Sequence, residues 1–316
     1  MEPKEKNGNF PAHVCIFLAA ATWGLMAPIG KDAMMNGITG LDMVFFRVAG
    51  AAACFWIASL FMRFFNRAVS QKKDTQGQSP KPPRKDILKF AAAGFFAIVC
   101  NQCCFTVGLS ITSPINASIV ATSLPIFALI SSAIFIKEKI TLQKILGIGL
   151  GLSGALILVL GSASSNNAKA GNIMGDLLCM TSQCSFAIYL SLFKNLIGKY
   201  NVVTCMKWMF TFSTLMVAPF TLGGVLSIPL ASITQVTWAE TSFVVFGGTF
   251  IAYLLVARAQ KVLRPTVVAM YNYVQPVTSA VVSIVAGLAI FGLSHGLAIT
   301  LIITGVYMVN SAKIKK

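Results

Sequence analysis

The sequence predicts an all-α integral membrane protein, with ten transmembrane helices arranged as two repeats of five. The chain of 316 residues is 56% hydrophobic and only 11% charged, and its mean hydropathy is +0.77, whereas a soluble protein carries about 25% charged residues. The sequence also repeats itself at a spacing of 151 residues, because Pro114 and Pro125 recur as Pro265 and Pro276. In addition, the basic residues are concentrated in every second connection between the apolar stretches.

A transmembrane helix needs about 20 mostly apolar residues, and ten stretches of the chain meet that requirement. The first five lie in a predicted repeat over residues 11–161, and the last five lie in a second repeat over residues 172–312. The small, polar stretch 162–171 separates the two repeats and is typical of a linker. The ten predicted spans cover residues 13–31, 41–62, 87–109, 114–136, 143–161, 172–194, 204–222, 238–258, 265–288 and 295–312.

The distribution of basic residues predicts how these spans are oriented. If the N-terminus is cytoplasmic, all but three of the 25 Lys and Arg residues fall on or next to the cytoplasmic side, most densely in the basic loop 63–86. Lys31 and Lys169 fall on the opposite side, and Arg47 lies within a span. Cytoplasmic loops of membrane proteins carry such an excess, so we expect both termini in the cytoplasm. The net charge of +16 then reflects topology, and we expect no nucleic-acid partner.

The sequence contains no enzyme motif in its required context. An H-E-x-x-H pair and a phosphate-cradling Gly-Lys motif are absent from it. One G-x-S-x-G match, Gly292-Leu293-Ser294-His295-Gly296, lies at the start of the last apolar stretch, whereas a nucleophile elbow needs a turn from a strand to a helix. The only histidines, His13 and His295, lie at predicted helix ends, while a metal site needs clustered His, Cys, Asp or Glu side chains. We therefore expect no catalytic residue, no metal and no cofactor.

Four prolines predict breaks in two of the spans. Pro114 and Pro125 lie in the fourth span, and Pro265 and Pro276 lie at the corresponding positions of the ninth. Proline removes a backbone donor and frees a carbonyl one turn earlier, and in lipid the freed group must face protein or a water-filled cavity. Paired broken helices in two repeats are typical of secondary transporters with a central site. A structural kink without a ligand role is the alternative.

Polar and aromatic side chains near these breaks are the expected lining of such a cavity. Amide and hydroxyl groups are costly in lipid without partners, so we expect them to face the protein interior. For each one, packing between helices is the alternative role. A neutral lining of this kind suits a small zwitterion or neutral metabolite better than a multiply charged nucleotide. The predicted substrate-binding residues are Trp23, Asn101, Gln102, Thr122, Tyr189, Tyr253, Asn272, Tyr273 and Gln275.

Arg47 is the one basic residue predicted to lie clearly inside a span. A charge within the membrane is a functional hypothesis by default, so Arg47 is a candidate charge in the substrate pathway. The structural alternative is that it pairs with a carbonyl or with Asp42, or extends toward the outer surface. None of the nine carboxylates is predicted at mid-membrane, which favours facilitated transport or exchange over proton coupling.

Several short motifs resemble the EamA-type repeat of the drug/metabolite transporter superfamily. Trp23-Gly24 and Arg47 resemble the first part of that repeat. The second part is similar to the run Gly108-Leu109, Ser113-Pro114, Ala117, Pro125, Lys137-Glu138-Lys139, Gly147 and Gly154. The resemblance covers about residues 11–312. One departure is that the position corresponding to Glu138 in the second repeat is Ala289, so we interpret Glu138 as helix-end structure.

The resemblance implies two inverted five-helix repeats, a substrate path between helices 1, 3, 4, 6, 8 and 9, and alternating access. Family members export amino acids and other metabolites, or carry nucleotide sugars. We therefore predict a permease that moves a small, amino-acid-like metabolite outward across the plasma (inner) membrane, with the solute and the lipid bilayer as its partners. The alternatives are a nucleotide-sugar or phosphorylated-metabolite exchanger, a membrane-embedded enzyme, and a signalling subunit that does not transport.

Overall fold

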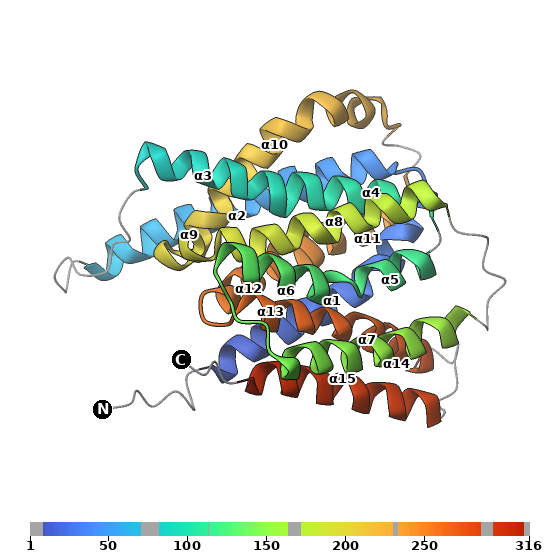
Figure 1. Cartoon of the computed structure of the whole chain (residues 1–316). Helices are drawn as coiled ribbons and strands as arrows, with labels where there is room; N and C mark the ends of the chain where they lie inside the picture. Colours follow the sequence, from blue (N-terminus) through green and yellow to red (C-terminus); the bar gives the residue numbers. More distant parts are fainter. Residues whose placement is uncertain are drawn as a thin grey trace, which may run out of the picture.

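The computed structural model describes residues 9–70, 82–112, 114–163, 172–229, 233–285 and 293–312. Within them every regular element is a helix (Figure 1), which confirms the predicted all-α class. Residues 164–171 of the predicted linker and 71–81 of the predicted basic loop lie outside the described residues. The helices are α1 (Phe10–Met35), α2 (Gly40–Ser70), α3 (Arg84–Gly94), η1 (Phe95–Cys100), α4 (Asn101–Ile111), α5 (Pro114–Ala121), α6 (Leu124–Phe135), α7 (Leu142–Ala163), α8 (Ile173–Leu192), α9 (Lys194–Lys199), α10 (Val202–Ser227), α11 (Gln235–Val245), η3 (Phe246–Ile251), α12 (Ala252–Gln260), α13 (Pro265–Met270), η4 (Tyr271–Tyr273), α14 (Val274–Val285) and α15 (Leu293–Ser311).

Seven helical runs in the described part of the chain are long and apolar enough to cross a membrane. Two shorter apolar helices, Ile119–Phe135 and Leu142–Ile157, overlap the predicted spans 114–136 and 143–161, and α13, η4 and α14 lie within the predicted span 265–288. Ten crossings and cytoplasmic termini stay predictions. The seven runs are Phe10–Met35, Gly40–Phe64, Arg84–Ile111, Ile173–Leu192, Val202–Ser227, Gln235–Gln260 and Leu293–Ser311.

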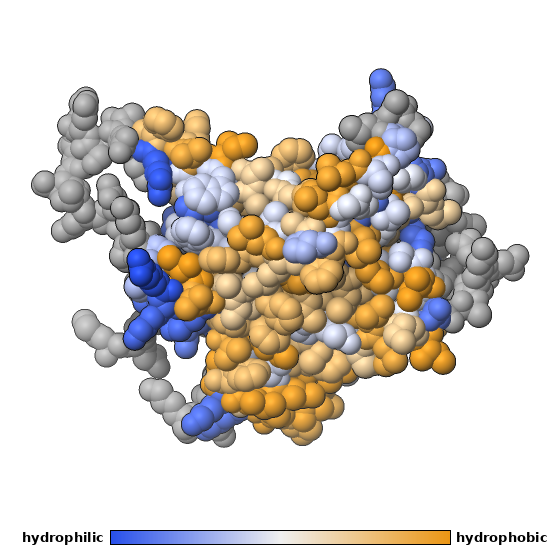
Figure 2. Space-filling model, turned by 90° about the horizontal axis from the view of Figure 1, so that it is seen from above, coloured by the Kyte–Doolittle hydropathy of each residue, from blue (hydrophilic) through white to orange (hydrophobic). Residues whose placement is uncertain are grey.

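The surface of the bundle is suited to lipid. Figure 2 shows apolar side chains over the middle of the molecule and hydrophilic side chains toward its two ends. Large apolar side chains are fully open, with Phe220 82% and Leu293 95% exposed. Such a continuous apolar surface is rare on soluble monomers and is what a bilayer covers. Figure 1 places the first residues of α1 and the last residues of α15 at the same end of the bundle, which we call the terminal end.

The fourth and ninth predicted spans are both interrupted about one turn before their second proline. In the fourth, the helix stops at Ala121 and resumes at Leu124, just before Pro125. In the ninth, the 3₁₀ turn η4 separates α13 from α14, which contains Pro276. The two interruptions have the same cause. A proline has no backbone N–H to donate to the carbonyl four residues earlier, and its ring clashes with that carbonyl, so the helix breaks there.

Two π-helical segments, η1 and η3, are a feature that the sequence did not predict. They begin at Phe95 and Phe246 and end at Cys100 and Ile251, so both ends are separated by the same 151 residues as the prolines. A π-helix bonds to the fifth residue rather than the fourth and is often found at functional sites. The internal repeat therefore extends from sequence to an uncommon backbone conformation.

Glycines allow α7 and α15 to lie against each other. A Cβ atom added at Gly147 would lie 2.8 Å from the carbonyl oxygen of Gly305, and one added at Gly305 would lie 2.5 Å from the carbonyl oxygen of Gly147. Small residues of this kind let membrane helices approach closely. Gly149, by contrast, lies on the same helix with nothing within 4 Å of an added Cβ.

This difference gives a matched pair of variants. We expect Gly147→Leu to destabilise the folded protein by about 1–3 kcal/mol or more, the usual cost of overpacking, because its side chain meets backbone that cannot move aside. Gly149→Leu should stay close to wild type, since its side chain enters lipid. Thermal unfolding of both variants in detergent micelles checks this, and equal losses would contradict close packing at Gly147.

Candidate functional site

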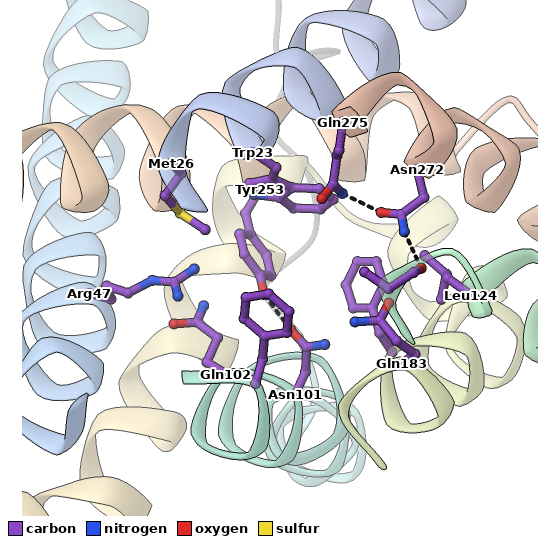
Figure 3. A pocket seen from close by; sticks show the side chains of 13 residues that line it. Trp23, Met26, Arg47, Asn101, Gln102, Leu124, Gln183, Tyr253, Asn272 and Gln275 are labelled. Carbon is purple, nitrogen blue, oxygen red and sulfur yellow. Dashed lines mark hydrogen bonds between the residues drawn. The ribbon is translucent and has the colours of Figure 1, made fainter. Parts of the chain in front are cut away.

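Polar and aromatic side chains from both predicted repeats surround a cavity inside the helix bundle. The centres of water-sized molecules can occupy a volume of about 70 Å³ in this cavity. A single water needs about 10–15 Å³ of such volume. It therefore holds several water-sized groups. Figure 3 shows the lining side chains converging on it. They are Trp23, Met26, Arg47, Asn101, Gln102, Phe105, Ala121, Leu124, Gln183, Phe186, Tyr253, Asn272 and Gln275.

The two π-helical segments position the centre of this lining. In the first repeat Gln102 follows η1, and in the second repeat Tyr253 follows η3 at the same spacing of 151 residues. Ala97 in η1 and Gly248 in η3 are also 151 residues apart. The carbonyl of Ala97 accepts a hydrogen bond from the Tyr253 hydroxyl, and that of Gly248 accepts one from Trp23 Nε1, both at 2.9 Å. Each π-helical segment thus anchors an aromatic side chain from the other repeat.

The two proline-associated breaks meet at one edge of the cavity. Asn272, in η4, donates through Nδ2 to the backbone carbonyl of Ala121, at the end of α5, at 2.5 Å. These two residues again occupy corresponding positions, 151 residues apart. Gln275 donates through Nε2 to Asn272 Oδ1. The side chain at one break therefore satisfies a carbonyl left free at the other, as a polar group in lipid requires.

Aromatic rings form the wall between the amide groups. Trp23 lies edge-on to both Phe186 and Tyr253, with ring centroids 5.8 and 5.9 Å apart, a preferred aromatic geometry. Asn101 Nδ2 donates to Ser182 Oγ at 2.9 Å, and its Oδ1 accepts from the Tyr253 hydroxyl at 3.4 Å. These contacts hold the wall in a fixed shape and leave its apolar faces toward the cavity.

Arg47, on α2, is buried among neutral partners. It is 6% exposed, and it donates through Nε to Thr249 Oγ1 at 3.1 Å and through Nη1 to Thr106 Oγ1 at 3.4 Å. The predicted alternative of pairing with Asp42 is wrong, since Asp42 Oδ2 accepts from the backbone N–H and hydroxyl of Thr39 at the start of its own helix. Among the described residues, Arg47 forms no ion pair.

Three predicted residues do not line this cavity. The Thr122 hydroxyl donates to the carbonyl of Ile119 in its own turn, at 2.5 Å. The Tyr273 ring packs on Gly151 of α7, where an added Cβ would lie 2.5 Å from it, and its hydroxyl donates to the carbonyl of Ile148. Tyr189 is 1% exposed behind Phe186. The other predicted substrate residues and Arg47 are all in the lining.

Six further side chains in the lining were not among the predicted substrate residues, and two of them, Ala121 and Leu124, flank the break in the fourth predicted span. Met26 and Phe105 follow Trp23 and Gln102 by three residues, the spacing of neighbours on one helix face, so that spacing could have identified them. Gln183 and Phe186, on α8, are related in the same way. Their residue types do not distinguish a cavity wall from a packed core, which explains why sequence reasoning missed Phe186. Among the described residues, no group of three His, Cys, Asp or Glu side chains could hold a metal ion.

Apolar helices around a small polar cavity are typical of membrane transporters, and comparison with known proteins gives the class. The profile of the EamA-like transporter family matches residues 10–160 and 173–311. The chain therefore belongs to the EamA-like transporter family, within the drug/metabolite transporter superfamily. The resemblance seen in the sequence is confirmed.

Individual relatives agree with this assignment. An uncharacterized transporter of Archaeoglobus fulgidus is 32% identical over 150 residues, which are 46% of this chain, and the match spans only about half, 52%, of that relative. The uncharacterized transporter YyaM of Bacillus subtilis is 23% identical over 67% of this chain and 70% of its own length. A WAT1-related protein of Arabidopsis thaliana is 20% identical over 96% of this chain and 84% of its own. One solved crystal structure shares the fold, with a TM-score of 0.72, 18% identity and 94% coverage of both chains.

Proposed function

We propose that this chain is a secondary transporter that moves a small, amino-acid-like metabolite outward across the plasma membrane by alternating access. Its ten spans form two inverted repeats, over residues 11–161 and 172–312, joined by the linker 162–171, with both termini in the cytoplasm. The substrate binds in the central cavity, where Trp23, Asn101, Gln102, Tyr253, Asn272 and Gln275 contact it.

One observation carries this proposal: both repeats supply the cavity with side chains and backbone at corresponding positions. Gln102 corresponds to Tyr253, and Ala121 corresponds to Asn272. Transporters built from repeats bind their substrate where the repeats meet, beside broken helices. Such a site can face either side of the membrane in turn when one repeat rocks against the other.

Contacts between the repeats at the terminal end support this mechanism. Ser132 Oγ lies 3.1 Å from Ser191 Oγ, and both side chains are buried. Farther out, Asp86 in the first turn of α3 accepts from Lys199 Nζ at 2.7 Å, and this hydrogen bond to the carboxylate raises the pKa of Lys199. We propose that these contacts close the cavity toward the terminal end and that they separate when it opens there.

The composition of the lining favours a small solute over the alternatives. A nucleotide sugar needs several cations for its phosphates, whereas Arg47 is the only basic residue among the described residues that line the cavity. An enzyme would need a nucleophile, acid or base in the site, and that lining contains no His, Asp or Glu. Space for several water-sized groups also fits a metabolite of few heavy atoms.

Counterflow in proteoliposomes tests the proposal. The purified protein is reconstituted, the vesicles are loaded with one unlabelled amino acid at a time, and uptake of the same labelled amino acid is followed. We expect saturable accumulation above protein-free vesicles for at least one amino acid. Accumulation of a sugar nucleotide or phosphorylated metabolite instead would overturn the solute class. If none of the tested solutes accumulates, the alternative of a subunit that does not transport is favoured.

A further inference from the structure

We propose that Arg47 and Gln102 form a subsite for a single carboxylate group of the bound solute. The inference rests on the proposed function, because it names the chemistry that the same cavity recognises. It assigns one end of the cavity to the carboxylate and the aromatic wall to the remainder of the solute. Figure 3 places the guanidinium group of Arg47 and the amide group of Gln102 at one side of the cavity, away from Asn272.

The first step is the unbalanced charge of Arg47. A guanidinium group has five N–H donors and cannot be deprotonated in a protein, and two of these donors bond to threonine hydroxyls. The remaining donors have no acceptor among the described residues, although the side chain is 6% exposed. A buried charge without a counter-charge is strongly unfavourable. Because Arg47 lines the cavity, an anionic group of the solute can supply that charge.

The second step is the unsatisfied amide of Gln102. This side chain is 1% exposed, and neither its Nε2 nor its Oε1 makes a hydrogen bond of good geometry among the described residues, since the nearby Tyr253 hydroxyl donates to the carbonyl of Ala97. Buried polar groups are nearly always paired, so an unpaired one calls for an explanation. Gln102 lies one helical turn before Thr106, which contacts Arg47, so both donors lie within reach of one ligand. A carboxylate has two oxygens and can accept from the guanidinium and from the amide N–H at once.

The third step is the choice of anion. A phosphate group carries up to two charges and recruits several cations, but the described lining offers Arg47 alone. Beyond this pair the wall is made of aromatic rings, small or apolar side chains and neutral amides, with no other charge among the described lining residues. An apolar or uncharged body fits there. The geometry therefore points to a monocarboxylate, either an amino acid or an acid that lacks the amine.

Three small probes of equal carbon number test the subsite: propionate, alanine and propionamide. The purified full-length protein in detergent is titrated with each, against sodium chloride of equal ionic strength, and its melting temperature is measured. We expect propionate or alanine to raise the melting temperature and propionamide to leave it unchanged. A larger rise in melting temperature with alanine than with propionate identifies an amino-acid site. A larger rise with propionate identifies an organic-acid site. Equal responses to propionate and propionamide, or no response to either carboxylate, would overturn the proposal.

Variants show whether Arg47 is responsible. Arg47→Gln keeps donors for the two threonines, and we expect it to weaken carboxylate binding at least about tenfold, as the loss of a charge-assisted contact does. The Gln102→Glu variant places a carboxylate beside Arg47, so the protein itself supplies the negative charge that the solute would otherwise bring. We expect this variant to melt at a higher temperature than wild type without ligand and to lose its response to propionate.

Gln183→Glu is the matched control, since Gln183 lines the same cavity and Figure 3 places it on the side away from Arg47. We expect this change to lower the melting temperature, because the new carboxylate has no cation beside it. Equal destabilisation by Gln102→Glu and Gln183→Glu would contradict the subsite. Carboxylate binding without counterflow would refute transport and leave the subsite standing, whereas counterflow with unchanged acid affinity in Arg47→Gln would refute the subsite alone.

Discussion

Replacing Glu138 with alanine should destabilise the protein by about 3–5 kcal/mol, the cost of removing one partner of a buried ion pair. Glu138 follows α6 and is buried. Its Oε1 lies 2.9 Å from Lys144 Nζ, and the two side chains are 3% and 1% exposed. Its Oε2 accepts from Thr266 Oγ1 at 3.0 Å, at the start of α13 in the other repeat. The variant leaves the Lys144 ammonium buried without a counter-charge and removes a bond between the repeats.

Denaturant titration of the detergent-solubilised protein measures this loss. The control is the double variant Glu138→Leu/Lys144→Met, which removes both charges together. Since apolar replacement of a whole buried pair is often neutral or stabilising, we expect it to be much closer to wild type than the single variant. If the single variant were as stable as the double variant, the ion pair between Glu138 and Lys144 would not stabilise the protein. Glu138 was interpreted from the sequence as helix-end structure, and these contacts place it at a junction between repeats.

Crosslinking Ser132 to Ser191 should abolish transport reversibly. These side chains belong to α6 in the first repeat and α8 in the second, and their Oγ atoms lie 3.1 Å apart in a buried contact. In Ser132→Cys/Ser191→Cys, oxidation is expected to form a disulfide that holds the two helices together. If alternating access separates them, counterflow should fall at least about tenfold, a loss equivalent to about 1.4 kcal/mol or more.

Reducing agent should restore counterflow in the double variant. Each single cysteine variant, oxidised in the same way, is the control for thiol modification and for the eight cysteines already in the sequence. Full counterflow in a sample whose disulfide is verified by mass spectrometry would mean that α6 and α8 do not separate during transport. Rocking of the two repeats at this contact would then be wrong.

The repeat in the sequence predicted much of the site because corresponding positions share a backbone environment. The spacing of 151 residues that relates the prolines also relates Gln102 to Tyr253 and Ala121 to Asn272, and all four line the cavity. Buried amides need partners in lipid, which is why several of the predicted polar residues lie in the lining; their role in binding stays a prediction.

The residues that the sequence did not place correctly depend on local backbone geometry. A 3₁₀ turn advances each residue by about 120° instead of 100°, and in η4 the Tyr273 side chain packs on α7 instead of facing the cavity. Thr122 bonds to its own turn, as threonine often does. The π-helical segments have no characteristic residue, because five of six positions in η1 are apolar or aromatic like those of any membrane helix. Side-chain placement around them therefore needed the structure.

Counterflow by two matched glutamine variants tests the central claim that this cavity is the transport site. Gln275 lines the cavity and donates to Asn272, while Gln143, on the outer face of the bundle, donates to the carbonyl of Met308. Each change to alanine removes one amide hydrogen bond. We expect Gln275→Ala to lower counterflow at limiting solute about tenfold, as the loss of 1.4 kcal/mol of binding does, and Gln143→Ala to retain it. Equal rates for both variants and wild type would contradict the account.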